Sequence, residues 1–266
     1  MKIVFLGTGA ADNDPAVTEK LAGRAFSAEH RRNAALLLND RVLIDCGPGV
    51  PGALRILGIP PAQITDLLVT HTHADHICPS AVASVAAAVS AAGRPPLRVW
   101  CEPGAAFRFA GIPGLALQSL TPPQTADVSD LQVTPLFSNH LVEDSPERTL
   151  HFFIEQQNRR LFYGCDGAWL LSAEYAFLLG KQIDVFVFDG TVGDDGSDFR
   201  MATHNSLPMI RLMLQALRPQ KVFAEDGRIL LSHIAPTLYG MDAAAMEALL
   251  QRDGLTAACD GMTIRL

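Results

Sequence analysis

One pattern recurs along this chain: short apolar runs, rich in β-branched residues, several of which lead directly into a histidine or an aspartate. The runs lie at residues 3–6, 34–38, 41–45, 66–70, 97–100, 131–137, 150–155, 160–164, 184–189, 221–224 and 228–232. Runs of this length and composition are typical of buried strands. Helical periodicity lies between some of them, at about 50–57, 76–92, 169–180, 205–217 and 241–251. Strands that alternate with helices predict a layered α/β structure, and the hairpin-like runs of the first half favour two mixed sheets.

The chain shows no internal division. It has no repeat, charge block or low-complexity linker, and the proline-rich patches at 94–97 and 120–124 are typical of loops. Hydrophobic residues make up 48% of the sequence, which is enough for a sizeable core. We therefore expect residues 1–266 to form a single domain.

Charge and cysteine content restrict the partners and the compartment. The formal net charge of −7 argues against a broad face for nucleic acid, so no long nucleic acid is expected as a partner. The longest apolar tract, residues 80–92, is too short and too rich in alanine to span a bilayer, so no membrane is expected either. The five cysteines are scattered and form no CxxC pair, which is typical of free thiols in the cytoplasm.

Polar residues follow five of the apolar runs at the point where each run ends. They are His71, His73, Asp75 and His76, then His140, Asp166, Asp189 and His233. Ligand sites of open α/β sheets collect at the carboxyl ends of strands. The five ends together therefore predict one shared site.

The string HTHADH at residues 71–76 indicates a metal site. A borderline divalent metal such as zinc accepts imidazole nitrogen and carboxylate oxygen. His71 and His73 can point the same way from an extended segment. Asp75 and His76 follow a turn and suit a neighbouring ion better, so four ligands in six positions suggest two adjacent metals.

HTHADH also resembles the H-x-H-x-D-H signature of the metallo-β-lactamase superfamily. FLGTGAAD (5–12), LIDCGPG (43–49), YGCDGAW (163–169) and LSHIAP (231–236) resemble the remaining motifs of that family in their order, so the resemblance spans essentially the whole chain. It implies a four-layer αββα sandwich with a dinuclear site between its sheets.

The resemblance also implies a role for each matching residue. His71, His73 and His140 would hold the first metal, Asp75, His76 and His233 the second, and Asp166 would bridge them. Asp45 would orient the ligand loop from behind the ligands. Two divalent ions outweigh the charge of two carboxylates and a hydroxide, so the centre would favour a small anionic substrate and hydrolysis by a metal hydroxide.

The segment MATHNSLPMIRLML (201–214) narrows the chemistry. It is similar to the extra histidine segment of ribonuclease Z and of the phosphoribosyl cyclic-phosphate phosphodiesterases, and LQVTPLFSNH (131–140) and ACDGMTI (258–264) look particularly like the latter. His204 would then protonate the leaving alkoxide or hold a phosphate oxygen, with Asp189 to orient it, and Asp75 would be the second catalytic residue. The long basic arm with which ribonuclease Z grips tRNA has no counterpart.

The expected function is therefore a dinuclear metal-dependent phosphodiesterase of small phosphate esters, cyclic ones included, with zinc or manganese as the metal. A lactone, thioester or carboxylic-ester hydrolase of the same fold and a metal-binding accessory protein of low turnover stay open as alternatives. Arg31 and Arg32 are weak candidates for contact with a substrate phosphate, and a solvated pair is the alternative. Whether His30 reaches the site and whether the chain forms a homodimer also stay open.

Overall fold

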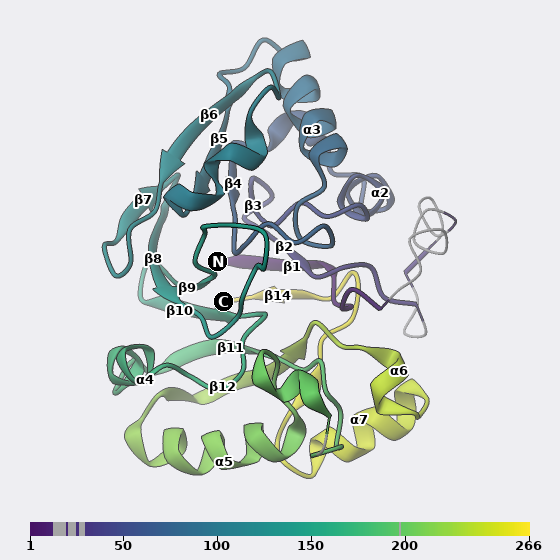
Figure 1. Cartoon of the computed structure of the whole chain (residues 1–266), viewed down its shortest axis with the longest axis vertical. Coiled ribbons are helices and arrows are strands. Elements are labelled where there is room, and N and C mark those ends of the chain that lie inside the picture. The colour runs from purple at the N-terminus through teal and green to yellow at the C-terminus, as the bar shows by residue number, and fades with distance from the viewer. Residues whose placement is uncertain (13–19, 21–24, 27–29, 197) are drawn as a thin grey trace.

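Two sheets pack face to face in the computed structural model, and the helices cover their outer faces (Figure 1). The structure describes residues 1–12, 20, 25–26, 30–196 and 198–266. Each sheet has seven strands. The α/β class and the four-layer arrangement expected from the sequence are confirmed.

The first sheet has the order β14-β1-β2-β3-β4-β5-β6. Its first three pairings are antiparallel and its last three are parallel. The strands are β1 (Lys2–Gly7), β2 (Ala35–Leu38), β3 (Val42–Ile44), β4 (Asp66–Leu68), β5 (Leu97–Cys101), β6 (Leu115–Ser119) and β14 (Thr263–Arg265).

The second sheet repeats this scheme in the order β7-β8-β9-β10-β11-β12-β13. Three antiparallel pairings are again followed by three parallel ones. The strands are β7 (Ala126–Val128), β8 (Leu131–Phe137), β9 (Leu150–Gln156), β10 (Arg159–Gly164), β11 (Ile183–Asp189), β12 (Phe223–Ser232) and β13 (Thr256–Ala257).

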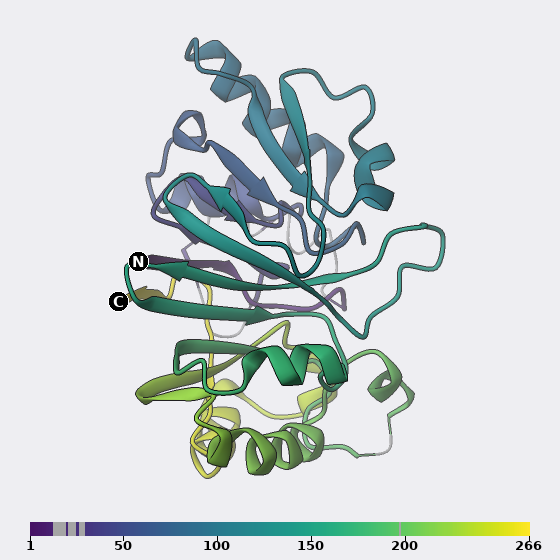
Figure 2. The ribbon, with the colours of Figure 1, turned by 90° about the vertical axis from the view of Figure 1, so that its left-hand side faces the viewer.

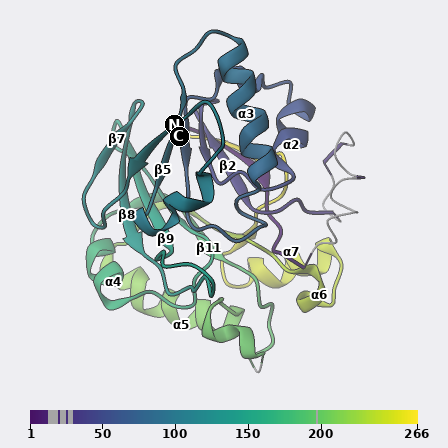
Figure 3. The same cartoon turned by 45° about the horizontal axis from the view of Figure 1, so that its top comes forward.

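Helices cover both outer faces, as the tilted view in Figure 3 shows. The first sheet carries α2 (Val50–Ile56), α3 (Pro79–Ala91) and the short 3₁₀ turns η1 (Pro61–Gln63) and η2 (Pro103–Phe109). The second sheet carries α4 (Ser172–Leu178), α5 (Leu207–Leu217), α6 (Pro236–Tyr239) and α7 (Ala243–Gln251), and the 3₁₀ turns η3 (Phe199–Ala202) and η4 (Arg218–Gln220) lie in the same half of the chain. Among the described residues, no helix combines the length and the apolar composition that crossing a bilayer requires.

Both faces of the central strands are buried, which explains why their sequences are apolar throughout. In β2, Leu36 and Leu38 belong to the core between the sheets, whereas Leu37 packs under α2 and α3. In β10, Tyr163 faces the inner core and Phe162 faces the helices of the second sheet. Side chains of a strand alternate between its faces, so a strand buried on both sides reads as a continuous apolar run.

Several element boundaries differ from the expectation. Residues 221–224 and 228–232 lie in or next to one long strand, β12, and the helix expected from residue 76 begins at Pro79 because residues 71–78 form the ligand loop. The helix expected from 169 begins at Ser172, since Trp169 has a positive φ of 61°. The apolar pattern does not predict the short strands β6, β7, β13 and β14, because partly exposed strands lack the continuous apolar signature.

The hairpin between β2 and β3 turns at Asn39 and Asp40, where both residues have positive φ. The ends of the chain lie side by side, as Figure 2 shows. β1 pairs antiparallel with β14, and the amino group of Met1 donates to the carbonyl of Leu266 at 3.1 Å. This pairing completes the edge of the first sheet.

Truncation of Phe186 should test the core of the second sheet. Its ring is fully buried and lies 4.5 Å from the ring of Phe162 and 4.4 Å from that of Phe188, between centroids. We expect Phe186→Ala to lower the free energy of unfolding by about 3–5 kcal/mol, because the removed ring leaves a cavity. Phe199→Ala removes a ring that is 82% exposed and should change it by less than about 0.5 kcal/mol. Urea denaturation of the metal-free protein measures both, and equal effects of the two variants would contradict the described core.

Candidate metal centre

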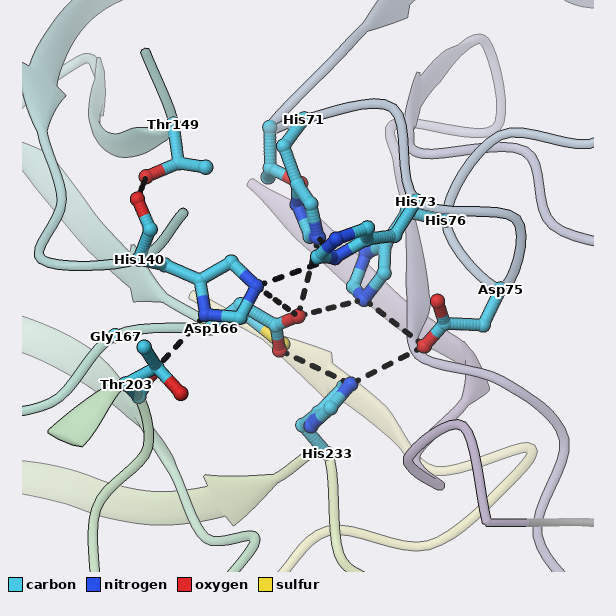
Figure 4. Close-up of polar contacts among 12 residues, drawn as sticks. His71, His73, Asp75, His76, His140, Thr149, Asp166, Gly167, Thr203 and His233 are labelled. Atoms are coloured by element: carbon cyan, nitrogen blue, oxygen red, sulfur yellow. Dashed lines mark hydrogen bonds and ion pairs between the residues drawn. The ribbon is translucent and has the colours of Figure 1, made fainter. Parts of the chain in front are cut away.

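The predicted ligands converge at one edge of the sandwich, where strands of both sheets end (Figure 4). The loop after β4 carries His71, His73, Asp75 and His76 from the first sheet. His140 lies after β8, Asp166 after β10 and His233 after β12, all in the second sheet. The structure therefore brings together all seven residues that the sequence proposed as metal ligands.

The first group consists of His71, His73, His140 and Asp166, whose ligand atoms all lie within 4.8 Å of one another. Nδ1 of His73 lies 3.0 Å from Nε2 of His71 and 3.2 Å from Nε2 of His140. Three ring nitrogens therefore point at one spot, and three neutral imidazoles cannot satisfy all of these nitrogens by hydrogen bonds to one another. A metal ion satisfies such a set of lone pairs, so these residues fit a divalent ion.

The second group consists of Asp75, His76 and His233, again with ligand atoms within 4.8 Å of one another. Oδ2 of Asp75 lies 3.4 Å from Nε2 of His76 and 3.4 Å from Nε2 of His233. Nε2 of His76 is buried and makes no well-formed hydrogen bond among the described residues, although carboxylate oxygens lie near it. An ion at this spot would give it a partner.

Asp166 lies between the two groups and touches both. Its Oδ2 atom is 3.2 Å from Nε2 of His71 and 3.1 Å from Nε2 of His76, and its Oδ1 atom is 3.0 Å from Nε2 of His233. Figure 4 shows the carboxylate in the centre of the site. This is the position that a bridging ligand requires.

The ring nitrogens that point away from the centre have partners of their own. Nδ1 of His71 lies 3.0 Å from the hydroxyl of Thr70, and Nδ1 of His140 lies 3.1 Å from the carbonyl of Thr203. Nδ1 of His233 lies 2.8 Å from the hydroxyl of Thr191. Such partners fix the ring orientation and leave the other nitrogen for a metal. Burial and the neighbouring histidines hold the pKa of His71 well below its ordinary value. Burial also lowers the pKa of His140. Both shifts favour the neutral imidazole, which is the form that binds a metal.

Asp45 lies behind the ligand loop and contacts it at two points. Its buried carboxylate accepts hydrogen bonds from the Thr70 amide at 2.9 Å and the Thr70 hydroxyl at 2.7 Å, and it lies 2.8 Å from Nδ1 of His76. Burial raises the pKa of Asp45, although these hydrogen bonds act in the opposite direction. Asp45 thus contacts both ends of the loop, and its role in orienting the loop stays a prediction.

The backbone at the strand ends takes unusual conformations that turn these side chains into the site. Asp45, Asp166 and His233 have φ values of 63°, 57° and 56°. Positive φ is uncommon outside glycine, although Asp and His tolerate it better than most residues. The direction of these side chains therefore depends on the surrounding contacts, which hold the backbone there.

His204 lies beside both groups. Its Nδ1 is 2.7 Å from Oδ2 of the fully buried Asp189, and its ring centroid is 4.8 Å from that of His140 and 5.4 Å from that of His233. Burial lowers the pKa of His204, but the charge and the hydrogen bond of Asp189 outweigh it and raise the pKa to about 9. A protonated imidazole at this place can donate from Nε2.

A pocket of about 340 Å³ opens over the centre. Its lining comprises Ala11, His73, Ala74, Asp75, His140, Leu141, Glu143, Asp166, Thr203, His204 and His233. His204, Asp75 and Asp166 thus face the same space.

Arg31 and Arg32 are both buried and have partners inside the protein. Arg31 donates to the hydroxyl of Thr8 at 2.7 Å and to the carbonyl of Ala258, and the amide of Arg32 donates to Asp260 at 2.8 Å. They are therefore not the solvated pair that was the alternative, and their contact with a substrate stays a prediction. His30 is exposed.

Sequence reasoning missed the residues that hold the ligands. Thr70 bonds both Asp45 and His71, and Thr191 bonds both Asp189 and His233. Glu147, which is buried, accepts from the hydroxyl of Thr72 inside the ligand loop. The only available signal was proximity, since Thr70 directly precedes His71 and Thr191 lies two positions after Asp189.

Gly47→Ala should disturb the second group of ligands. A Cβ atom on Gly47 would lie 1.9 Å from the carbonyl oxygen of Asp75, so the ligand loop has to move. We expect the affinity for divalent metal, measured by isothermal titration calorimetry, to fall by about tenfold or more, as after the loss of a residue that supports a ligand. Gly196→Ala is the matched control, because among the described residues its new Cβ would meet only Pro208, at 3.9 Å. Unchanged affinity in Gly47→Ala would contradict this tight contact.

Comparison with known proteins agrees with the geometry. Residues 40–234 match the family model of the beta-lactamase superfamily domain. A segment of 58 residues is 48% identical to the anti-Pycsar protein Apyc1 of Bacillus phage 010DV004, and it covers 21% of this chain and 23% of the relative. A segment of 77 residues is 36% identical to ribonuclease Z of Pyrobaculum arsenaticum and covers 29% of this chain and 23% of the relative. The matches thus span about a quarter of the length of these curated relatives.

Among solved structures, a new diphosphatase from the PhnP family has the same fold, with a TM-score of 0.74 at 17% identity. The superposition covers 99% of this chain and 96% of that one. Because the family model matches most of the length and the fold agrees over nearly all of it, this chain belongs to the metallo-β-lactamase superfamily.

Proposed function

We propose that this protein is a dinuclear metal-dependent phosphodiesterase that hydrolyses a small phosphate ester, cyclic esters included. The observation that carries the proposal is His204, held by Asp189 beside both groups of ligands. A metal centre alone would serve many hydrolytic reactions, whereas a fixed proton donor suits the departure of a poor alkoxide leaving group. The names of the relatives, which include a ribonuclease and a diphosphatase, support phosphate as the substrate class.

The family implies a divalent-metal site, and the donor sets fit two ions. His71, His73 and His140 would hold one ion, Asp75, His76 and His233 the other, and Asp166 would contact both. Imidazole and carboxylate ligands suit zinc and manganese. When bound, the ions supply positive charge that attracts a phosphate and makes water more acidic.

The side chains of the chain perform the proton transfers. His204 donates the proton of Nε2 to the leaving oxygen, because its Nδ1 faces Asp189. Asp189 stabilises the protonated ring and also accepts from the amide of Thr191 at 2.8 Å, which fixes its own position. Asp75 lines the pocket and can accept a hydrogen bond from the attacking water. As the water oxygen bonds to phosphorus, the bond from phosphorus to the leaving oxygen breaks, so Asp75 and His204 act on opposite sides of the phosphorus.

The pocket favours a substrate of low negative charge. Among the described residues that line it, none is a lysine or an arginine, and Glu143 lies at its rim with Oε2 3.5 Å from Nε2 of His73. An ester with one negative charge needs no further cation beyond the metals, whereas a free terminal phosphate would meet the carboxylate of Glu143. A monoanionic phosphodiester therefore fits this pocket better than a polyphosphate, and the formal net charge of −7 disfavours a long nucleic acid.

We also infer that the chain acts as one domain in the cytoplasm. Both sheets supply ligands, so neither half would form the centre alone. The five cysteines are free, and Cys46, Cys101 and Cys165 are buried in the described structure, which suits a reducing compartment.

The metal content tests the centre directly. Purified protein should contain close to two transition-metal ions per chain by elemental analysis, and removal of the metals by a chelator should abolish phosphodiesterase activity. His76→Ala should retain about one ion, because it removes a ligand of one group and leaves the other group complete. A content near zero after supplementation with zinc and with manganese would overturn the dinuclear centre.

His204→Ala tests the proton donor. The variant should keep both metals and lose about 10²–10⁴-fold in kcat towards alkyl phosphodiesters, since these leave poorly without a proton. With p-nitrophenyl esters, which leave as stable anions, the loss should be much smaller. Equal losses with both substrates would contradict the proton-donor role. A panel that includes lactones and thioesters shows whether another ester class is preferred, which would overturn phosphate as the substrate.

A further inference from the structure

A buried pair of charged residues lies behind the centre and belongs to neither group of ligands. His151 is the second residue of β9, and Glu174 lies in the first turn of α4. Nδ1 of His151 is 2.6 Å from Oε1 of Glu174, and both side chains are at least 98% buried. Burial of such a pair costs solvation free energy, so its place in the structure calls for a physical reason.

The other side of the His151 ring lies against the residue that follows Asp166. A Cβ atom on Gly167 would lie 2.8 Å from both Cε1 and Nε2 of His151, and 2.7 Å from the hydroxyl of Ser138. Only glycine leaves room for the ring and for this hydroxyl. His151 and Gly167 are therefore complementary in shape.

Two hydrogen bonds complete the enclosure of this turn. The hydroxyl of Ser138 donates to the carbonyl of Asp166 at 2.6 Å, and the amide of Gly167 donates to Asp189 at 3.1 Å. Burial lowers the pKa of His151, but Glu174 outweighs this and raises it, and the carbonyl of Asp166 raises it further. Nε2 of His151 is buried and makes no well-formed hydrogen bond among the described residues.

The turn needs this enclosure because of its backbone. Asp166 has a φ of 57°, a conformation that persists only where the surroundings impose it. Ser138 and Asp189 hold the turn through hydrogen bonds, and the His151 ring fills the remaining side. Glu174 prevents that ring from rotating away.

We propose that His151, held by Glu174, is a positioning residue that fixes the Asp166-Gly167 turn and thereby sets the Asp166 carboxylate between the two metal positions. The inference rests on the proposed dinuclear function. His151 is not a member of the ligand groups described above, and it acts through the Asp166-Gly167 backbone against which its ring lies. The structure thus assigns it a role in metal affinity.

Metal binding to the full-length chain tests this assignment. The metal-free protein is titrated with Co²⁺, and both the dissociation constants and the visible absorption bands of the bound ion are measured. His151→Ala and Glu174→Ala should weaken binding by about 10–100-fold and shift the absorption bands. Glu174→Gln keeps an oxygen that accepts from Nδ1 and should bind nearly as well as the wild type.

A double variant tests the packing of His151 against Gly167. Gly167→Ala should weaken Co²⁺ binding, because its Cβ pushes against the ring and the turn. Adding His151→Ala should restore part of that affinity, since the ring with which the Cβ collides is gone. Additive losses in the double variant would overturn the complementary fit.

Asp66→Asn serves as the control for general destabilisation. Asp66 is also buried, and it accepts from Trp100 at 2.8 Å and pairs with Arg98, but it lies at the far end of β4 from the ligand loop. It should lower the melting temperature and leave Co²⁺ affinity unchanged. His151→Gln is measured as well, so that the test survives if the alanine variant fails to fold.

Three results are decisive. Wild-type affinity and spectra in both His151→Ala and Glu174→Ala would overturn the positioning role. A wild-type chain that binds no Co²⁺ would overturn this inference together with the proposed centre. A chain that binds two ions but hydrolyses no phosphodiester would overturn the proposed function alone, and the comparison of affinities would still decide the role of His151.

Discussion

The carboxylate of Asp166 is the contact on which the site depends. It lies within 3.2 Å of histidine nitrogens that belong to both ligand groups, and its backbone stays in a left-handed conformation. A shift of this one residue would change the distance of its oxygens to both groups at once. The residues around it, from Ser138 to the His151–Glu174 pair, are best understood as supports for that single position.

Polar side chains surround this contact in two shells. Histidine rings form the inner layer, and buried hydroxyl and carboxylate groups, such as Thr191 and Asp45, hold the outer ring nitrogens. The chain as a whole carries a formal charge of −7, yet bound divalent ions would leave the centre positive. Because the protein offers no lysine or arginine among the described residues of the pocket, attraction of an anion would come from the metals and from His204.

The sequence predicted the parts of this structure that leave a local signal. Continuous apolar runs marked the central strands, since burial on both faces requires apolar residues at every position. The His and Asp residues at their ends marked the site. The threonines behind the ligands and the burial of Arg31 and Arg32 left no such signal, because they depend on contacts between segments that are far apart in sequence. The edge strands β6 and β7 were missed for a related reason: their polar faces resemble loops.

Each group of ligands takes residues from both sheets: His71 and His73 come from the first and His140 from the second, while Asp75 and His76 meet His233. An ion bound at either position would therefore link the two sheets of the sandwich through its ligands. Loss of the metals would thus lower the stability of the folded protein. Proteases would then cleave the metal-free chain faster than the metal-loaded one.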